Sequence, residues 1–154
     1  MSELDKKLLE ALQKDGRISY TELAEKYDAN VSTVSNRVQR LMDRGVLKIV
    51  GVVNPFKAGN SFVADFRLKI ALPRLQSAIE ILKEIQEVRF IAATTGTYNV
   101  VLEIYTSSNE ELNRIMNEKI GSIEGVISID TSVILEVHKQ SYNYDIHLHN
   151  GFSD

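Results

Sequence analysis

Cysteine and tryptophan are both absent from this chain of 154 residues, and proline occurs only twice. Without cysteine the protein has no disulfide, no thiolate ligand for a metal and no cysteine nucleophile. No apolar run approaches the roughly 20 residues that cross a bilayer, and the polar N-terminal segment lacks the features of a signal peptide. We therefore expect a cytoplasmic protein that does not enter a membrane.

Recognisable catalytic motifs are also missing. The glycines are isolated and form no phosphate-binding loop, and no nucleophile lies in a known local motif beside a base. His147 and His149 lie close to Asp145, and this set could bind a metal only with further ligands from elsewhere. A polar tail over residues 139–154 is the better interpretation, so the sequence predicts no enzyme activity, no cofactor and no metal site.

Charge is distributed unevenly along the chain, whose net charge is −3. Residues 1–61 contain ten Lys and Arg against eight Asp and Glu, whereas residues 62–154 contain eight against thirteen. Between residues 30 and 57, five basic residues accompany a single acidic one, Asp43. A local positive surface on an otherwise acidic chain favours contact with phosphates in that one region.

Residues 19–41 predict two short helices joined by a tight turn. Ser19 and Glu22 have the spacing of a capping box, which starts the first helix. Residues 28–30 favour local hydrogen bonds that end it, and Ser32 is expected to cap the second helix. A preceding helix over about 3–14, capped by Ser2, would complete a three-helix core.

The second helix of this pair has two different sides. Its apolar positions fall within about 100° of one another and are expected to face the core; they are Val31, Val34, Val38, Leu41 and Met42. The opposite side is polar and basic, and it gathers Thr33, Asn36, Arg37, Arg40 and Arg44. A solvated helix face is one interpretation, but the two capped helices and the basic ridge together favour a helix-turn-helix DNA reader.

The DNA contacts predicted from this arrangement form two groups. Arg37, Arg40 and Asn36, with help from Thr33, are expected to reach base edges, and Ser35 belongs to the same helix. Helix starts and flanking loops meet the backbone first, so phosphates are expected at a second group of side chains. This group contains Tyr20, Thr21, Ser32, Arg44 and Lys48.

After the helices the pattern becomes extended. β-Branched residues dominate the run VLKIVGVVNP, which predicts a strand-like arm or small wing up to about residue 53. Pro55 prevents a regular element from continuing, and we expect a connector over 54–61. The predicted organisation is therefore a DNA-binding domain over 1–53, this connector, a second domain over 62–138 and a tail over 139–154.

The second domain shows the order βαββαβ. We expect strands over about 62–70, 88–94, 98–106 and 126–137, one helix opening at Pro73 and another capped by Ser108 or Asn109. The predicted fold class is α+β, with an N-terminal three-helix winged helix-turn-helix and a C-terminal ferredoxin-like sandwich.

Two helices cover only one face of such a four-stranded sheet. The residues expected on the other face are mainly apolar, namely Val63, Ile91, Ala93, Val101, Tyr105, Val126 and Ile134. An apolar patch of this size is unusual on a monomer. A homodimer made by stacking or extending the sheets is therefore predicted.

The chain resembles the Lrp/AsnC (feast/famine) family of transcription regulators from about residue 2 to residue 139. The resemblance depends on the joint order of four segments: ISYTELAEKYDANVSTVSNRVQRLMDRGVL, GVVNPFKAG, TGTYNVVLEIY and GVISIDTSVILEV. It implies dimers that assemble further, commonly into octamers, binding to double-stranded promoter DNA, and in many members a free amino acid as effector.

The effector site implied by this resemblance is altered here. The family's hairpin typically reads G-D-Y/F-D, and this chain has Gly96, Thr97, Tyr98 and Asn99 instead. Loss of both acidic groups leaves three alternatives: a different ligand, hydrogen bonding alone, or no ligand. We expect effector contact at these four residues with Thr131 and Ser132, and an ordinary hairpin turn is the alternative.

Two other functions use the same features. A chromosome-organising protein would bend DNA with weak sequence preference and no effector. A metabolic sensor or enzyme domain with protein-binding helices is disfavoured by the basic ridge.

Overall fold

The computed structural model describes residues 1–60 and 62–147 and divides the chain into two compact units. Among the described residues, the first unit contains 1–52 and 139–147, and the second contains those between 53 and 138. His149 and the rest of the segment 148–154 lie outside the described residues.

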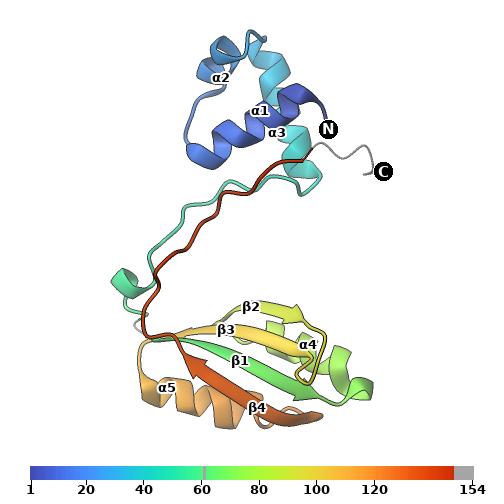
Figure 1. Ribbon diagram of the computed structural model, residues 1–154, viewed down its shortest axis with the longest axis vertical. Coiled ribbons are helices and arrows are strands. Elements are labelled where there is room, and N and C mark those ends of the chain that lie inside the picture. The colour runs from blue at the N-terminus through green and yellow to red at the C-terminus, as the bar shows by residue number, and fades with distance from the viewer. Residues whose placement is uncertain (61, 148–154) are drawn as a thin grey trace. The chain divides into compact units, whose positions relative to one another are not determined.

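Three helices form the first unit (Figure 1): α1 (Glu3–Lys14), α2 (Tyr20–Lys26) and α3 (Val31–Asp43). The capping box predicted at Ser19 and the cap predicted at Ser2 are both confirmed, and Ser2 also forms a capping box. In each case the hydroxyl accepts the backbone N–H three residues later, and the side chain of that residue accepts the N–H of the serine. The cap predicted at Ser32 is wrong. Asp28 adopts a left-handed conformation with φ of 49°, and the chain enters α3 at Val31, so Ser32 is already inside the helix.

The core of this unit forms where the apolar stripes of the three helices meet. Its fully buried members are Leu8, Ala11, Leu12, Leu23, Ala24, Val34 and Val38, with Met42 packed against them. Val31 is an exception to the predicted stripe, because 45% of its surface is exposed. It is the first residue of α3, where the helix has not yet reached its neighbours.

The extended segments near the domain boundary do not form strands. Residues 46–53 were expected to make an arm or wing, but they contain no strand, and Val50, Val52 and Val53 are exposed. A short turn, η1 (Phe56–Ala58), follows. The last strand also ends earlier than predicted, at Val133. Composition alone suggested strands here, but a strand also needs a neighbour for its backbone hydrogen bonds.

The second unit has the predicted βαββαβ order. Its strands are β1 (Phe62–Ile70), β2 (Val88–Ala93), β3 (Val100–Thr106) and β4 (Val126–Val133), arranged antiparallel in the order β2-β3-β1-β4. The helices are α4 (Leu75–Lys83), which follows the turn η2 (Leu72–Arg74) containing Pro73, and α5 (Asn109–Arg114), which continues as the π-helical turn η3 (Ile115–Ile120). Both helices cover one face of the sheet (Figure 1). The ferredoxin-like sandwich is therefore confirmed.

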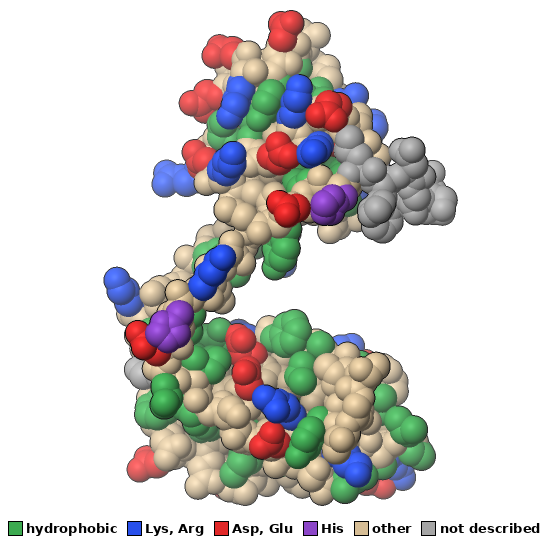
Figure 2. All heavy atoms as spheres, in the orientation of Figure 1, with side chains coloured by type: hydrophobic (Ala, Val, Ile, Leu, Met, Phe, Trp, Pro, Cys, Tyr) green, Lys and Arg blue, Asp and Glu red, His purple; other side chains and the backbone are tan. Residues whose placement is uncertain are grey.

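The two faces of this sheet differ in composition. The helix-covered face buries residues such as Phe66, Leu68, Leu102 and Ile104. The other face is mixed: the strand registers place Asp65, Arg67, Lys69, Glu103 and Asp130 on it. Figure 2 shows acidic and basic side chains in the middle of the visible face of this unit, with hydrophobic side chains around them.

The predicted apolar composition of the open face is therefore wrong at its centre. Ile91, Ala93 and Val126 were expected there. Ile91 and Val126 instead pack against the core under the helices, and Ala93 lies opposite the buried Val100 on the same helix-covered face. A one-residue difference in strand parity moves a side chain to the opposite face, and both parities of these strands are apolar enough to allow either choice.

No helix among residues 1–60 and 62–147 is long and apolar enough to cross a membrane.

Candidate nucleic-acid interface and effector hairpin

The outer side of α3 presents most of the predicted DNA contacts to solvent. Asn36, Arg40 and Arg44 are exposed, as is Ser32, while Thr33 and Ser35 are half-buried. The first turn of α3 has no acidic residue, in contrast to the first turns of α1 and α2. The positive end of the helix dipole is therefore not neutralised from within the helix, which favours an approaching phosphate.

Arg37 lies on the same helix but is held by α1. Its guanidinium donates to Asp5 Oδ1 at 2.9 Å and to Ser2 Oγ at 2.8 Å. The side chains of Arg37 and Asp5 are 33% and 15% exposed, so this ion pair is half-buried. Arg37 thus attaches α3 to the capping box at the start of α1. The sequence analysis missed this contact, because nothing in the local pattern pairs residues 32 positions apart.

The pKa of Asp5 reflects this environment. Burial alone raises the pKa, but the hydrogen bonds from the Ser2 backbone N–H, the Arg37 guanidinium and the Ser2 hydroxyl outweigh burial and hold the pKa of Asp5 below its ordinary value. The carboxylate therefore stays ionised and keeps Arg37 engaged at neutral pH.

The residues predicted to hold phosphates occupy three different settings. Tyr20 is half-buried and packs against the three-helix core, whereas Thr21 beside it is exposed. Lys48 is exposed and lines a cavity together with the tail residues Tyr142 and Asp145. The three side chains therefore differ in how freely they can move toward a bound duplex.

The hairpin between β2 and β3 contains the predicted effector residues. Gly96 has φ of 106°, a conformation that favours glycine, and a Cβ added there would have no neighbour within 4 Å. Gly96 is thus explained by the backbone conformation rather than by close packing. Thr97 is exposed and Tyr98 half-buried, and the Thr94 hydroxyl donates to the Tyr98 carbonyl at 2.9 Å.

Asn99 is bound to the neighbouring strand. Its side-chain amide donates to the Ile70 carbonyl at 2.7 Å and accepts the Ile70 N–H at 2.8 Å. Its own backbone N–H donates to the Leu68 carbonyl at 3.0 Å. An aspartate could accept the Ile70 N–H but could not donate to the Ile70 carbonyl. An amide therefore fits this position, where it holds the end of β1.

Thr131 and Ser132 are not brought next to the hairpin within one chain. In the β1–β4 register they lie opposite Phe66 and Asp65, whereas Asn99 binds Ile70, four residues or roughly 13 Å farther along β1. They also point to opposite faces, because the Thr131 hydroxyl lies 3.8 Å from Met116 Sδ in the helix-covered layer and Ser132 is exposed. The six predicted effector residues therefore do not form one site in a single copy of this chain.

Two family models match this chain. The model of winged helix-turn-helix DNA-binding domains covers residues 1–48, and the model of the Lrp/AsnC ligand binding domain covers residues 64–144. The first match contains α1, α2 and α3, and the second contains β2, β3, β4 and β1 from residue 64 onward. Each family model therefore lies mainly on one of the two structural units.

Known proteins resemble the chain over almost its whole length. An uncharacterized HTH-type transcriptional regulator of Pyrococcus furiosus is 35% identical over 92% of this chain and 97% of its own length. The structure of Escherichia coli AsnC has a TM-score of 0.83 at 25% identity, covering 91% of this chain and 95% of that one. A Neisseria meningitidis regulator, solved as a complex with L-Met, has a TM-score of 0.83 at 22% identity and covers 92% and 94%. On the matched domains, the extent of these likenesses and the shared fold, the chain belongs to the Lrp/AsnC family of DNA-binding transcriptional regulators.

Proposed function

We propose that this regulator reads duplex DNA by placing α3 in the major groove, with Arg40 and Asn36 at base edges and Thr33 and Ser35 beside them. The observation that carries the proposal is the state of Arg40. It is exposed on the polar side of α3, and among residues 1–60 and 62–147 no hydrogen bond or ion pair holds its guanidinium. A free guanidinium can donate two parallel hydrogen bonds to guanine.

In this proposal Arg37 positions α3 rather than reading a base. Its bonds to Asp5 and Ser2 position α3 on α1, so direct contact with a base would require it to leave a half-buried carboxylate. Breaking that pair leaves Asp5 without its cation. We therefore rank Arg40 above Arg37 as a base reader and assign Arg37 to holding the helix in place.

Phosphate contacts complete the interface. We assign them to Thr21, Ser32, Arg44 and Lys48, which are exposed, and to the hydroxyl of Tyr20 at the start of α2. Such contacts fix the register of the protein on the duplex and make binding depend on salt.

The test uses a duplex selected by the wild-type protein from a random-sequence pool. Arg40→Ala is expected to weaken binding to it by about 5–150-fold, corresponding to about 1–3 kcal/mol, and to relax preference at one base position. Lys7→Ala, which removes the same charge from an exposed position on α1, is the matched control and should change affinity less than threefold. Equal affinities of Arg40→Ala and wild type for this duplex would contradict the assignment of Arg40 to a base edge.

We further propose that the regulator works in the cytoplasm as a homodimer that assembles to an octamer. The open face of the sheet supports the pairing of subunits, since it carries the exposed Phe90 opposite Glu103 of β3 and charges of both signs on β1. Two reader helices in a dimer predict a pseudo-palindromic site with half-sites about one helical turn, or a multiple, apart. Sedimentation of the free protein tests the assembly state.

A free amino acid is the proposed effector, acting on amino-acid metabolism through the hairpin Gly96, Thr97 and Tyr98. The match to the ligand binding domain and the L-Met complex of the Neisseria relative support this class of ligand. Because Thr131 and Ser132 lie opposite Phe66 and Asp65, away from the hairpin of their own chain, they would have to come from a second copy. Stabilisation by a proteinogenic amino acid at millimolar concentration in a thermal-shift screen is expected; no response to any of them would favour a regulator without an effector.

A further inference from the structure

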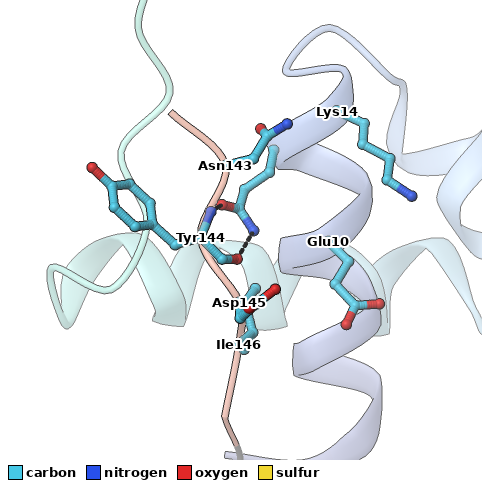
Figure 3. A pocket seen from close by; sticks show the side chains of 7 residues that line it. Glu10, Lys14, Asn143, Tyr144, Asp145 and Ile146 are labelled. Carbon is cyan, nitrogen blue, oxygen red and sulfur yellow. Dashed lines mark hydrogen bonds between the residues drawn. The ribbon is translucent and has the colours of Figure 1, made fainter. Parts of the chain in front are cut away.

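The end of the chain is attached to the helical unit by a paired hydrogen bond. The Gln13 side-chain amide donates to the Tyr144 carbonyl at 3.0 Å and accepts the Tyr144 backbone N–H at 2.6 Å. Figure 3 shows Tyr144 beside α1, with Asn143, Asp145 and Ile146 continuing along the helix. The amide thus occupies both backbone groups of one residue, as a neighbouring strand does in a sheet.

A second observation points to the same surface. Leu9 is only 4% exposed, yet it is not part of the buried cluster formed by the three helices. It lies one helical turn before Gln13 on α1 and lines a cavity of about 400 Å³ with Leu47, Val46, Tyr142 and Ile146. Leu9 therefore belongs to a satellite apolar patch that the end of the chain lines from the other side.

The contact depends on the backbone of the tail more than on its aromatic ring. The Tyr144 residue is 75% exposed although its backbone is fully engaged by Gln13. Its neighbour two positions on, Ile146, is partly buried in the same cavity. Residues 142 and 144–147 all line this cavity without forming a helix or a strand, so this part of the tail follows the surface as an irregular segment.

We propose that the face of α1 around Leu9 and Gln13, together with residues 46–48, is a peptide-binding surface whose occupant is residues 142–146 of this chain. Gln13 recognises the backbone, and the apolar patch takes Ile146. Because the chain leaves the helical unit near residue 52 and returns to it near residue 139, this docking gives the helical unit a second attachment to the C-terminal unit. The tail is then a strap that limits the independent movement of the DNA-binding unit.

The test removes the tail and adds it back. A chain ending at Ser141 is expected to show faster amide hydrogen exchange in the second half of α1 and at 46–48, with the second unit unchanged. A synthetic peptide of residues 139–147 should bind this shortened chain and restore the protection. Gln13→Glu is nearly isosteric and can still accept the Tyr144 N–H, but it places a carboxylate oxygen against the Tyr144 carbonyl in place of the donor. Peptide binding should weaken by about tenfold, the size expected when one hydrogen bond is lost and two acceptors face each other.

Two variant peptides distinguish recognition of the tail backbone from nonspecific hydrophobic binding. A Tyr144→Ala peptide keeps the N–H and carbonyl and should bind within about threefold of the parent, whereas Tyr144→Pro removes the N–H and should bind about tenfold or more weakly. Lys7→Ala in the shortened chain is the control for α1 substitutions. Unchanged exchange after truncation, no binding of the parent peptide, or equal binding of the proline peptide would each overturn the proposal, and none of these outcomes depends on DNA.

Discussion

The outer side of α3 and the β2–β3 hairpin use the same kinds of polar side chain in opposite ways. Asn36 on α3 is exposed, while the side-chain amide of Asn99 both donates to and accepts from the Ile70 backbone. Within α3 the contrast recurs one turn apart, because Arg37 is held by Asp5 and Arg40 is not. A polar residue committed to its own fold has less to offer a ligand, so the two regions are expected to respond to mutation in different assays.

The largest effect on stability is expected at Asn99. Asn99→Ala removes both hydrogen bonds to the Ile70 backbone at the end of β1, and the free energy of unfolding should fall by about 2–4 kcal/mol. Urea unfolding followed by circular dichroism measures the loss. Thr97→Ala, in the same loop but exposed, is the control and should stay within about 0.5 kcal/mol of wild type. Equal stabilities of the two variants would show that Asn99 does not hold the end of β1.

Arg37 and Arg40 provide the next comparison. Arg37→Ala leaves the half-buried Asp5 carboxylate without its guanidinium and should destabilise the helical unit by about 1.5–3 kcal/mol, whereas Arg40→Ala should change stability by less than about 0.5 kcal/mol. Thermal unfolding of both variants at one protein concentration checks this. A destabilised Arg40→Ala protein would contradict the division of labour proposed for α3.

Acid should affect one partly buried, ion-paired carboxylate in each unit. The pKa of Asp5 lies below its ordinary value for the reasons given above, and the Lys119 ammonium, 2.8 Å from Glu87, lowers the pKa of Glu87 despite its burial. Both groups therefore contribute stability that is present above an ordinary carboxyl pKa of about 4 and is lost as pH falls through the lower native value.

Substitution should remove that acid dependence separately in each unit. Asp5→Asn is expected to reduce the loss of unfolding free energy of the helical unit as pH falls, which flattens the acid limb of its stability curve. Glu87→Gln should do the same for the second unit. Both variants should be less stable than wild type at pH 7. Glu25→Gln, at an exposed position on α2, is the control. An acid limb as steep as that of wild type in Asp5→Asn would mean that other groups govern it.

The smallest effect is expected at Lys48. If it holds a phosphate, Lys48→Ala should weaken binding to all duplexes alike, by less than about fivefold, and reduce the slope of log affinity against log salt by about 0.9. Titrations at several salt concentrations against a selected and an unrelated duplex measure both quantities. An unchanged slope would mean that Lys48 contacts no phosphate and only lines the cavity beside the tail.

Local signals made much of this fold predictable. The hydroxyls of Ser2, Ser19 and Ser108 cap the helices that were expected to begin there, because a cap depends on residues only three positions away. The order of strands and helices in the second unit also followed from its periodicity. Ser32 was misassigned because the left-handed turn at Asp28 shifts the start of α3, and nothing in the composition reports that turn.

Contacts between distant parts of the chain were not predictable in the same way. Gln13 meets Tyr144 across 131 positions and Asn99 meets Ile70 across 29, and a side-chain amide is compatible with solvent, ligand or backbone in each setting. The sheet face was misjudged because both parities of its strands are apolar. The site on α3 could be outlined from the sequence, but which of its two central arginines is free depends on the packing of α1.

The absence of cysteine permits a direct test of the central claim that α3 enters the major groove. Gln39→Cys creates a unique thiol at an exposed position of α3 that has no assigned DNA contact, and an iron chelate that cleaves nearby DNA can be attached to it. On a selected duplex the account predicts two clusters of strand cuts, centred about one helical turn or a multiple apart. Uniform cutting, or the same pattern from a chelate at Thr97→Cys in the hairpin, would contradict it.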